Sequence, residues 1–200
     1  MANIKAIIFD LNGVFIQSPK LSERFERDFD VPIDQFLPAL KEIMRFTYLP
    51  EANDTYSYWK PYLDKWKASL NQEEFYDYWF SAEKEVPELI EFAKGQQKEG
   101  KKIIILSNNF KERSKYYEKN FQFLNNFDGL YFSWQTGYLK PNPKAYEKIL
   151  EDHNLKPEEC IYFDDSEENI KIAQSLGITA YPFIDLEDTK EKLEYEKFVK

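Results

Sequence analysis

The sequence is poor in cysteine, histidine and glycine. Its 200 residues include one Cys, one His and six Gly. The single cysteine, Cys160, excludes an internal disulfide and suits a reducing compartment. The first apolar run, in "MANIKAIIFD", stops at Asp10 and is too short for a signal peptide or a membrane span. We therefore expect a cytoplasmic protein with no membrane partner.

Positive charge is also scarce. The chain carries 27 Lys and Arg against 36 Asp and Glu, which gives a formal net charge of −9. An acidic surface repels phosphate backbones, so the composition predicts no nucleic-acid partner. A chain of this length can bury one sizeable core, or a core together with a small accessory domain.

Short apolar runs indicate β-strands. The first two are nearly continuous in apolar residues rather than alternating, which is typical of strands covered on both faces. Helical patterns lie between the later runs, at 111–123, 143–152 and 166–176, and one follows the last run, at 185–198. This alternation predicts an α/β fold with a doubly wound, parallel, five-stranded sheet. The predicted strands are 4–9, 102–106, 129–132, 160–163 and 178–183.

The interval between the first two strands departs from this pattern. A βαβ crossover needs about a dozen residues, and residues 17–83 are far more than that. They contain no strand-like run and predict helices at roughly 21–29, 32–46, 53–68 and 71–84. We interpret residues 17–83 as a small all-helical domain, inserted into a core formed by residues 1–16 and 84–200.

Polar clusters stand at or after the ends of the predicted strands. In open α/β sheets, ligands bind outside the carboxyl ends of the strands, so these clusters are expected to converge. Each cluster alone also fits a turn, a helix cap, a capping box or a solvated loop lysine. Together they supply an attacking carboxylate, oxygen ligands for Mg²⁺, a hydroxyl donor and a cation, as phosphoryl transfer requires. The clusters are Asp10 to Asn12, Ser107 to Asn109, Lys140, and Asp164 with Asp165.

The order of these motifs resembles the haloacid dehalogenase superfamily, in the subgroup with a helical cap after the first strand. The first motif, Asp-x-Asp-Gly after an apolar strand, stands here as "DLNG" at 10–13. The second is Ser107 in "IIILSNN", and the third is Lys140 in "GYLKPNPKAY". The fourth is the acidic pair in "IYFDDSEENI". The resemblance covers nearly the whole chain and implies a Rossmann-like core with a cap domain.

The resemblance implies a role for each motif. Asp10 would be the nucleophile that forms an aspartyl-phosphate. Ser107 and Asn108 would bind the phosphoryl group, and Lys140 would offset its charge. Mg²⁺ would be held by the Asp10 carboxylate, the main-chain carbonyl of Asn12 and Asp165, with Asp164 acting in the outer shell. Asn169, one helical turn beyond Asp165, is expected to orient Lys140 or the metal shell.

Asn12 departs from the family pattern. In phosphatases of this family, the second Asp is the general acid and base, and an amide neither gives up nor accepts a proton at ordinary pH. Loss of that assistance lowers rates by about 10²–10⁴-fold, while the backbone carbonyl can still bind metal. Three explanations stay open: a subgroup with altered chemistry, a slow or non-catalytic protein, or an engineered substitution.

The predicted function is a Mg²⁺-dependent phosphatase acting on a small phosphorylated metabolite, as a monomer or weak homodimer. The alternatives are a non-catalytic binding protein of the same fold, or a dehalogenase or phosphomutase. The acidic pair disfavours a dehalogenase, which needs no metal. His153, the sole histidine, is expected at an exposed helix end, and Cys160 in buried packing.

Overall fold

The centre of the molecule is a parallel β-sheet. A computed structural model describes residues 4–199. Its main sheet has five strands in the order β5-β4-β1-β6-β7, and each neighbouring pair is parallel. The predicted doubly wound, five-stranded sheet is therefore confirmed. The strands are β1 (Ala6–Phe9), β4 (Lys102–Ser107), β5 (Gly129–Phe132), β6 (Cys160–Asp164) and β7 (Thr179–Pro182).

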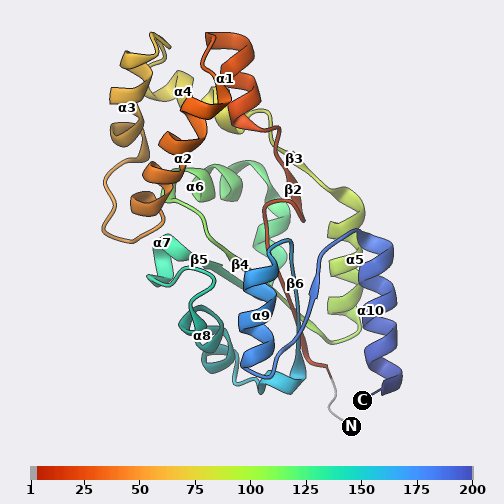
Figure 1. Ribbon diagram of the computed structural model, residues 1–200. Helices are drawn as coiled ribbons and strands as arrows, with labels where there is room; N and C mark the ends of the chain where they lie inside the picture. Colours follow the sequence, from red (N-terminus) through yellow and green to blue (C-terminus); the bar gives the residue numbers. More distant parts are fainter. Residues whose placement is uncertain (1–3, 200) are drawn as a thin grey trace.

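Helices cover both faces of this sheet, as Figure 1 shows. Alternation along β1 divides the core in two, with Ile7 and Phe9 on one face and Ala6 and Ile8 on the other. The first face is covered by α5 (Pro87–Lys98), α6 (Lys111–Asn120) and α10 (Leu186–Val199). The second is covered by α8 (Pro143–His153) and α9 (Glu167–Ser175). Burial on both faces explains why β1 and β4 have continuous apolar sequences.

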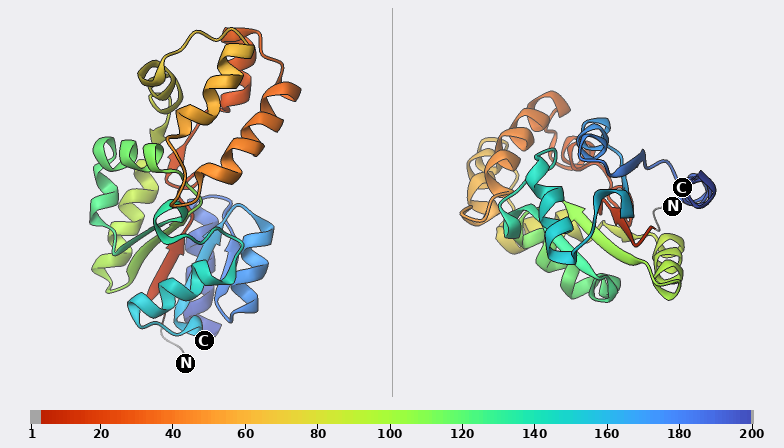
Figure 2. Two further views of the ribbon diagram at one scale, coloured as in Figure 1. Left: turned by 90° about the vertical axis from the view of Figure 1, so that its left-hand side faces the viewer. Right: turned by 90° about the horizontal axis from the view of Figure 1, so that it is seen from below.

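A separate helical group stands beyond the carboxyl ends of the strands (Figures 1 and 2). It consists of α1 (Leu21–Phe29), α2 (Ile33–Thr47), α3 (Thr55–Lys65) and α4 (Gln72–Phe80). Its own core is aromatic, with Trp59 stacked on Phe36 and in edge contact with Trp79. Phe110, at the start of α6, is buried in the same cluster and joins this group to the sheet. We call α1–α4 the cap.

Two short strands carry the chain between the sheet and the cap. β2 (Ile16–Gln17) pairs antiparallel with β3 (Lys84–Glu85), so the outgoing and returning segments run side by side. Sequence analysis did not predict this pair. The predicted domain boundaries at 16/17 and 83/84 fall on the β2–β3 pair, and the division into domains stays a prediction. Residues 1–3 and 200 of the predicted core lie outside the described residues.

Other differences from the predicted elements concern helices. The predicted helix 111–123 ends at Asn120, and a 3-10 turn, Gln122–Asn126, follows. The predicted helix 71–84 ends at Phe80. Helix α5 and the four-residue helix α7 (Ser133–Thr136) were missed. Within residues 4–199, no helix is both long and apolar enough to cross a membrane.

Candidate active site

The predicted polar clusters come together at one edge of the sheet. β4, β1 and β6 are neighbours and run parallel, so Ser107, Asp10 and Asp164 leave the sheet on the same side. Lys140 arrives from the loop before α8 and is 5% exposed. Strand order therefore gathers residues that lie up to 154 positions apart in the sequence (164 − 10).

Lys140 lies between two carboxylates. Its Nζ is 2.9 Å from Asp10 Oδ1 and 2.6 Å from Asp164 Oδ2. The side chains of Lys140 and Asp164 are 3% and 0% exposed, so little water screens these contacts. The cation therefore sets the charge balance of the site.

The pKa values of these groups reflect burial and mutual attraction. Burial raises the pKa of Asp10, and although Lys140 opposes this, the net value lies above its usual range. Burial also acts to raise the pKa of Asp164, but there Lys140 outweighs it and the net value is lowered. For Lys140, burial acts to lower the pKa, while Asp10 and Asp164 hold it above the ordinary value. Lys140 is thus a permanent cation at neutral pH.

Asp164 uses both of its oxygens inside the protein. Oδ2 accepts from Lys140 and from the Tyr162 hydroxyl. Oδ1 accepts from the Ser166 backbone N–H at 2.8 Å and from Asn169 Nδ2 at 3.0 Å. Asn169 therefore contacts Lys140's partner rather than Lys140. Asp164 is therefore placed to hold Lys140; its expected outer-shell role toward the metal stays a prediction.

The carboxylates of Asp10, Asp164 and Asp165 gather at the candidate metal site. One oxygen from each lies within 4.8 Å of the others. Asp165 is exposed, and a Cβ added at Gly13 would stand 3.4 Å from its Oδ2. Gly13 has φ +86°, which glycine adopts without strain, so the turn after β1 can pass close beside Asp165.

The donor set of this site fits Mg²⁺. Hard oxygen ligands are what Mg²⁺ prefers, and exposure of Asp165 leaves room for retained waters. Asp10 has two donors in the described part of the chain, the Lys140 ammonium and the Leu11 backbone N–H, and both contact Oδ1. Oδ2 of Asp10 thus stays available for a ligand.

Ser107 and Asn108 differ in how free their side chains are. Ser107 is buried, and its hydroxyl makes no hydrogen bond to the residues that the structure describes, so it is available to a ligand. The Asn108 amide is engaged twice with the Lys140 backbone: Nδ2 donates to the carbonyl at 2.8 Å, and Oδ1 accepts from the N–H at 2.8 Å. Asn108 therefore positions Lys140 and keeps one amide N–H for a ligand.

The Asn12 side chain lies against α6. Its Nδ2 donates to the Tyr117 hydroxyl at 2.7 Å. Tyr117 is fully buried, and Arg113, one turn earlier on α6, lies 5.4 Å from the centre of its ring. Arg113 in turn forms an ion pair with Glu83, in the segment between α4 and β3.

Sequence analysis missed several residues of this site. Tyr162 carried a usable signal, because it lies two positions before Asp164 on the same face of β6. Tyr117, Arg113 and Glu83 carried none, because they come from two separate segments. Tyr48, at the end of α2, also belongs to the site's surroundings. Burial raises its pKa above the ordinary value, Arg113 and Lys140 act to lower it, and Asp10 acts to raise it.

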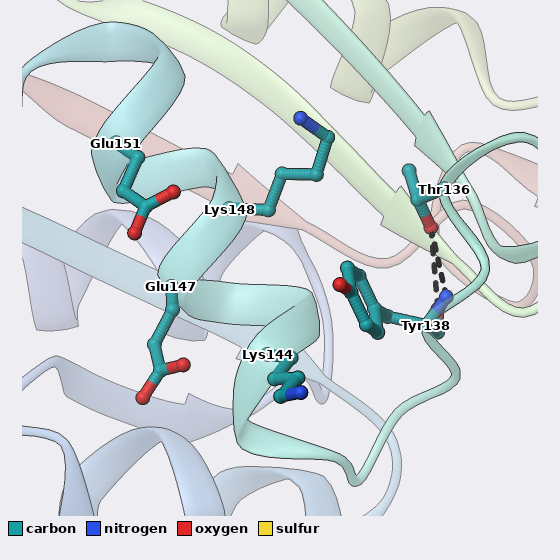
Figure 3. Close-up of a pocket in the computed structure, with 6 residues that line it drawn as sticks. All are labelled: Thr136, Tyr138, Lys144, Glu147, Lys148 and Glu151. Carbon is teal, nitrogen blue, oxygen red and sulfur yellow. Dashed lines mark hydrogen bonds between the residues drawn. The ribbon is translucent and has the colours of Figure 1, made fainter.

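A separate surface hollow lies beside α8 (Figure 3). It measures about 390 Å³ and contains none of the predicted site residues. Lysines and glutamates alternate along its wall, so it favours neither sign of ligand. Its lining residues are Thr136, Tyr138, Lys144, Glu147, Lys148 and Glu151.

Comparison with known sequences finds one family over most of the chain. The sequence model of the haloacid dehalogenase-like hydrolases matches residues 4–177. Rat bifunctional epoxide hydrolase 2 is 26% identical over 96% of this chain, which spans only 38% of that protein. A phosphorylated carbohydrates phosphatase of Thermotoga maritima is 23% identical over 88% of this chain and 82% of its own length.

Solved structures give the same fold. A haloacid dehalogenase family enzyme of Bacteroides thetaiotaomicron, crystallised with magnesium and inorganic phosphate, superposes with a TM-score of 0.73. Its sequence is 23% identical, and the match covers 90% of this chain and 94% of that one. At this identity the likeness establishes the architecture, α/β sheet and helical group together.

Proposed function

Because this chain belongs to the haloacid dehalogenase-like hydrolases, we propose that it is a Mg²⁺-dependent phosphatase that acts through Asp10. One observation carries the proposal: the buried Lys140 ammonium joins the Asp10 carboxylate to Asp164, with Asp165 beside them. This combines a nucleophile, a cation and metal-ligating oxygens at one edge of the sheet. Such a combination suits attack on a phosphoryl group.

In the first step, Asp10 attacks phosphorus, the bond to the leaving oxygen breaks, and that oxygen takes a proton from water. Lys140 offsets the negative charge shared by Asp10 and the phosphoryl oxygens. The unpaired hydroxyl of Ser107 donates to one of those oxygens. The product of the step is an aspartyl-phosphate on Asp10, which divides a difficult hydrolysis into two easier reactions.

Asp10, the Asn12 carbonyl and Asp165 are the groups that would hold Mg²⁺. When bound, the ion neutralises charge between the attacking carboxylate and the dianionic substrate. Asp164 does not serve as a direct ligand here, because all four hydrogen bonds described above engage its oxygens. It keeps Lys140 in place whether or not the ion is present.

In the second step, water attacks the aspartyl-phosphate. Its oxygen bonds to phosphorus, the bond from phosphorus to Asp10 breaks, and a proton passes from the water to a phosphate oxygen. Asn12 can orient this water by accepting a hydrogen bond at Oδ1 but cannot take its proton. We therefore expect the second step to be slow, by up to the 10²–10⁴-fold that a general base contributes.

The substrate class we propose is a small phosphorylated metabolite. The cap stands over the strand ends, and Pro50 of its α2–α3 loop lies 3.8 Å from the position a Cβ would take at Gly137, in the loop before Lys140. A site covered in this way leaves little room for a macromolecule. The name of the Thermotoga relative, a phosphatase of phosphorylated carbohydrates, supports the same class.

The proposal is tested by looking for a covalent phosphoryl adduct on the protein. The protein is mixed with Mg²⁺ and either p-nitrophenyl phosphate or a panel of sugar phosphates, quenched in acid, and measured by intact mass. We expect an added phosphoryl group that maps to Asp10, with slow release of inorganic phosphate. Asp10→Asn should lose the adduct, whereas Glu147→Gln, on the outer side of α8, should keep it. A folded chain that forms neither adduct nor phosphate across the panel contradicts the proposal.

A further inference from the structure

The Asn12 amide is tied to a buried tyrosine. Nδ2 of Asn12 lies 2.7 Å from the Tyr117 hydroxyl, and Tyr117 is 0% exposed. An amide NH₂ only donates, so the tyrosine oxygen is the acceptor of this bond. The proton of the Tyr117 hydroxyl is thus left for a second acceptor, and a buried donor is rarely left without one.

The candidate acceptor is Glu83, which acts on the pKa of Tyr117 and whose side chain is 1% exposed. Its Oε1 accepts from Arg113 Nε at 3.0 Å and from Ser18 Oγ at 3.0 Å. Its Oε2 is buried and has no partner at ordinary hydrogen-bond length among the described residues. Burial raises the pKa of Tyr117, and the Glu83 carboxylate raises it further by charge and by a hydrogen bond. A buried acceptor without a donor therefore lies beside a buried donor without an acceptor.

These bonds have only one consistent direction. Glu83 already accepts hydrogen bonds from Arg113 and Ser18, so toward Tyr117 it can only act as an acceptor of the hydroxyl O–H. Tyr117 must then accept from position 12, and only Nδ2 of the amide can donate. Oδ1 of Asn12, which accepts no hydrogen bond from the described residues, is left for a ligand or water.

We propose that Tyr117 and Glu83 are positioning residues that hold the Asn12 amide in one orientation, with Oδ1 free to accept from the attacking water. The role of the attacking water rests on the proposed phosphatase function, whereas the orientation of the Asn12 amide does not. It also explains why an amide suits position 12 in this chain. An aspartate there would set a carboxylate oxygen against the Tyr117 oxygen, whose only O–H is already directed to Glu83.

The orientation can be measured without catalysis. Protein labelled with ¹⁵N at asparagine side chains gives an amide signal for Asn12 that Asn12→Asp identifies by its disappearance. We expect Tyr117→Phe to shift that signal, and Glu83→Gln to shift it as well. Tyr131→Phe is the matched control, since it also removes a hydroxyl bonded to a carboxylate, Asp152 at 2.9 Å, and it should leave the signal in place.

The kinetic test is a double-mutant cycle between positions 12 and 117. In the wild-type background, Tyr117→Phe should slow release of phosphate from the phosphorylated enzyme roughly 2- to 10-fold, the size of one hydrogen bond. We expect Asn12→Asp to raise the rate. Adding Tyr117→Phe to Asn12→Asp should raise it further, because the crowded tyrosine oxygen is gone. A purely structural role for Tyr117 predicts the same loss in both backgrounds.

Each result has one meaning for the proposal. An Asn12 amide signal unmoved by Tyr117→Phe, in protein with wild-type thermal stability, overturns it. Equal losses in the two backgrounds overturn it also. If Glu83→Gln fails to fold, Tyr117→Phe carries the test alone. If the signal shifts as expected but no variant releases phosphate, the orientation stands and the proposed function fails.

Discussion

At the scale of a single residue, the Lys140 ammonium offsets the negative charges of Asp10 and Asp164. Replacing it with Met leaves Asp10 and Asp164 facing each other without a cation. Removing one partner of a buried ion pair lowers stability by about 3–5 kcal/mol, and we expect a loss of that size in urea unfolding with EDTA present. We expect phosphatase activity to be lost with it.

The matched control for this change is Lys148→Met. Lys148 pairs with Asp152 on the surface of α8, and its side chain is 40% exposed. Such pairs contribute about 0–1 kcal/mol, so this variant should unfold nearly as the wild type does. Equal losses of stability in the two variants would contradict the claim that the buried Lys140 stabilises the fold by offsetting Asp10 and Asp164.

His153 predicts a pH dependence of stability. Sequence analysis placed it at an exposed helix end, but the structure half-buries it, because its ring packs beside Tyr131 and Gly129. Burial, then Lys102, lowers its pKa below the ordinary 6.5. Below about pH 6.5 the unfolded chain binds more protons than the folded one. The free energy of unfolding therefore keeps its full contribution from His153 above about pH 6.5 and loses it as the pH falls.

We expect His153→Gln to remove this dependence. Thermal unfolding at about pH 7.5 and about pH 5.5 should show a larger loss of Tm for the wild type than for the variant. Asp10 and Asp165 also have raised pKa values, but they are present in both proteins, so the comparison cancels them. Equal losses in the two proteins would show that His153 titrates as it does in the unfolded chain.

At the scale of elements, the start of α4 is fixed by a capping box. Asn71 Oδ1 accepts from the Glu74 N–H at 3.0 Å, and Glu74 Oε2 accepts from the Asn71 N–H at 2.8 Å. Asn71→Ala should lower the free energy of unfolding by about 1 kcal/mol, measured in urea. Asn71→Asp restores an acceptor at the cap and should stay within a few tenths of the wild type. If aspartate destabilises as much as alanine, the cap bond is not the cause.

Elements differed in how much the sequence revealed. β1 and β4 were found because burial on both faces leaves a continuous apolar run. α5 was missed although Leu89, Ile90 and Ala93 have helical spacing, since Gly95 and the surrounding charges weaken the pattern. β2 and β3 have two residues each, too few for periodicity to register.

The site divides in the same way. Asp10, Ser107 and Asp165 follow parallel strands in local motifs, so their convergence follows from the strand order, and Lys140 joins them from the loop before α8. The hydrogen bond from Asn12 to Tyr117 joins two segments, and Glu83, from a third, influences Tyr117; no local pattern predicts this group. The amide at position 12 was visible in the sequence, but its partner depends on how α6 packs against the strand ends.

At the scale of the whole molecule, acidic charge predicts a response to divalent cations. The chain has a formal net charge of −9, and three carboxylates are gathered at the strand ends. A ligand that binds only the folded state stabilises it by mass action, by about 2.7 kcal/mol at a hundred times its Kd. For a protein of this size each kcal/mol raises Tm by roughly 2–4 °C, so saturating Mg²⁺ should raise Tm by several degrees.

The origin of that shift distinguishes a built site from diffuse attraction. Asp165→Asn removes a proposed ligand that is exposed and makes no ion pair among the described residues, so it should fold normally and lose most of the Mg²⁺-induced rise. Glu147→Gln removes the same charge from α8, outside the carboxylate group, and should keep the rise. Because both variants change the net charge by one, a nonspecific effect of Mg²⁺ on the acidic surface predicts equal losses. Scanning calorimetry of the two variants with Mg²⁺ and with EDTA decides between a site at the end of β1 and β6 and the charge of the molecule as a whole.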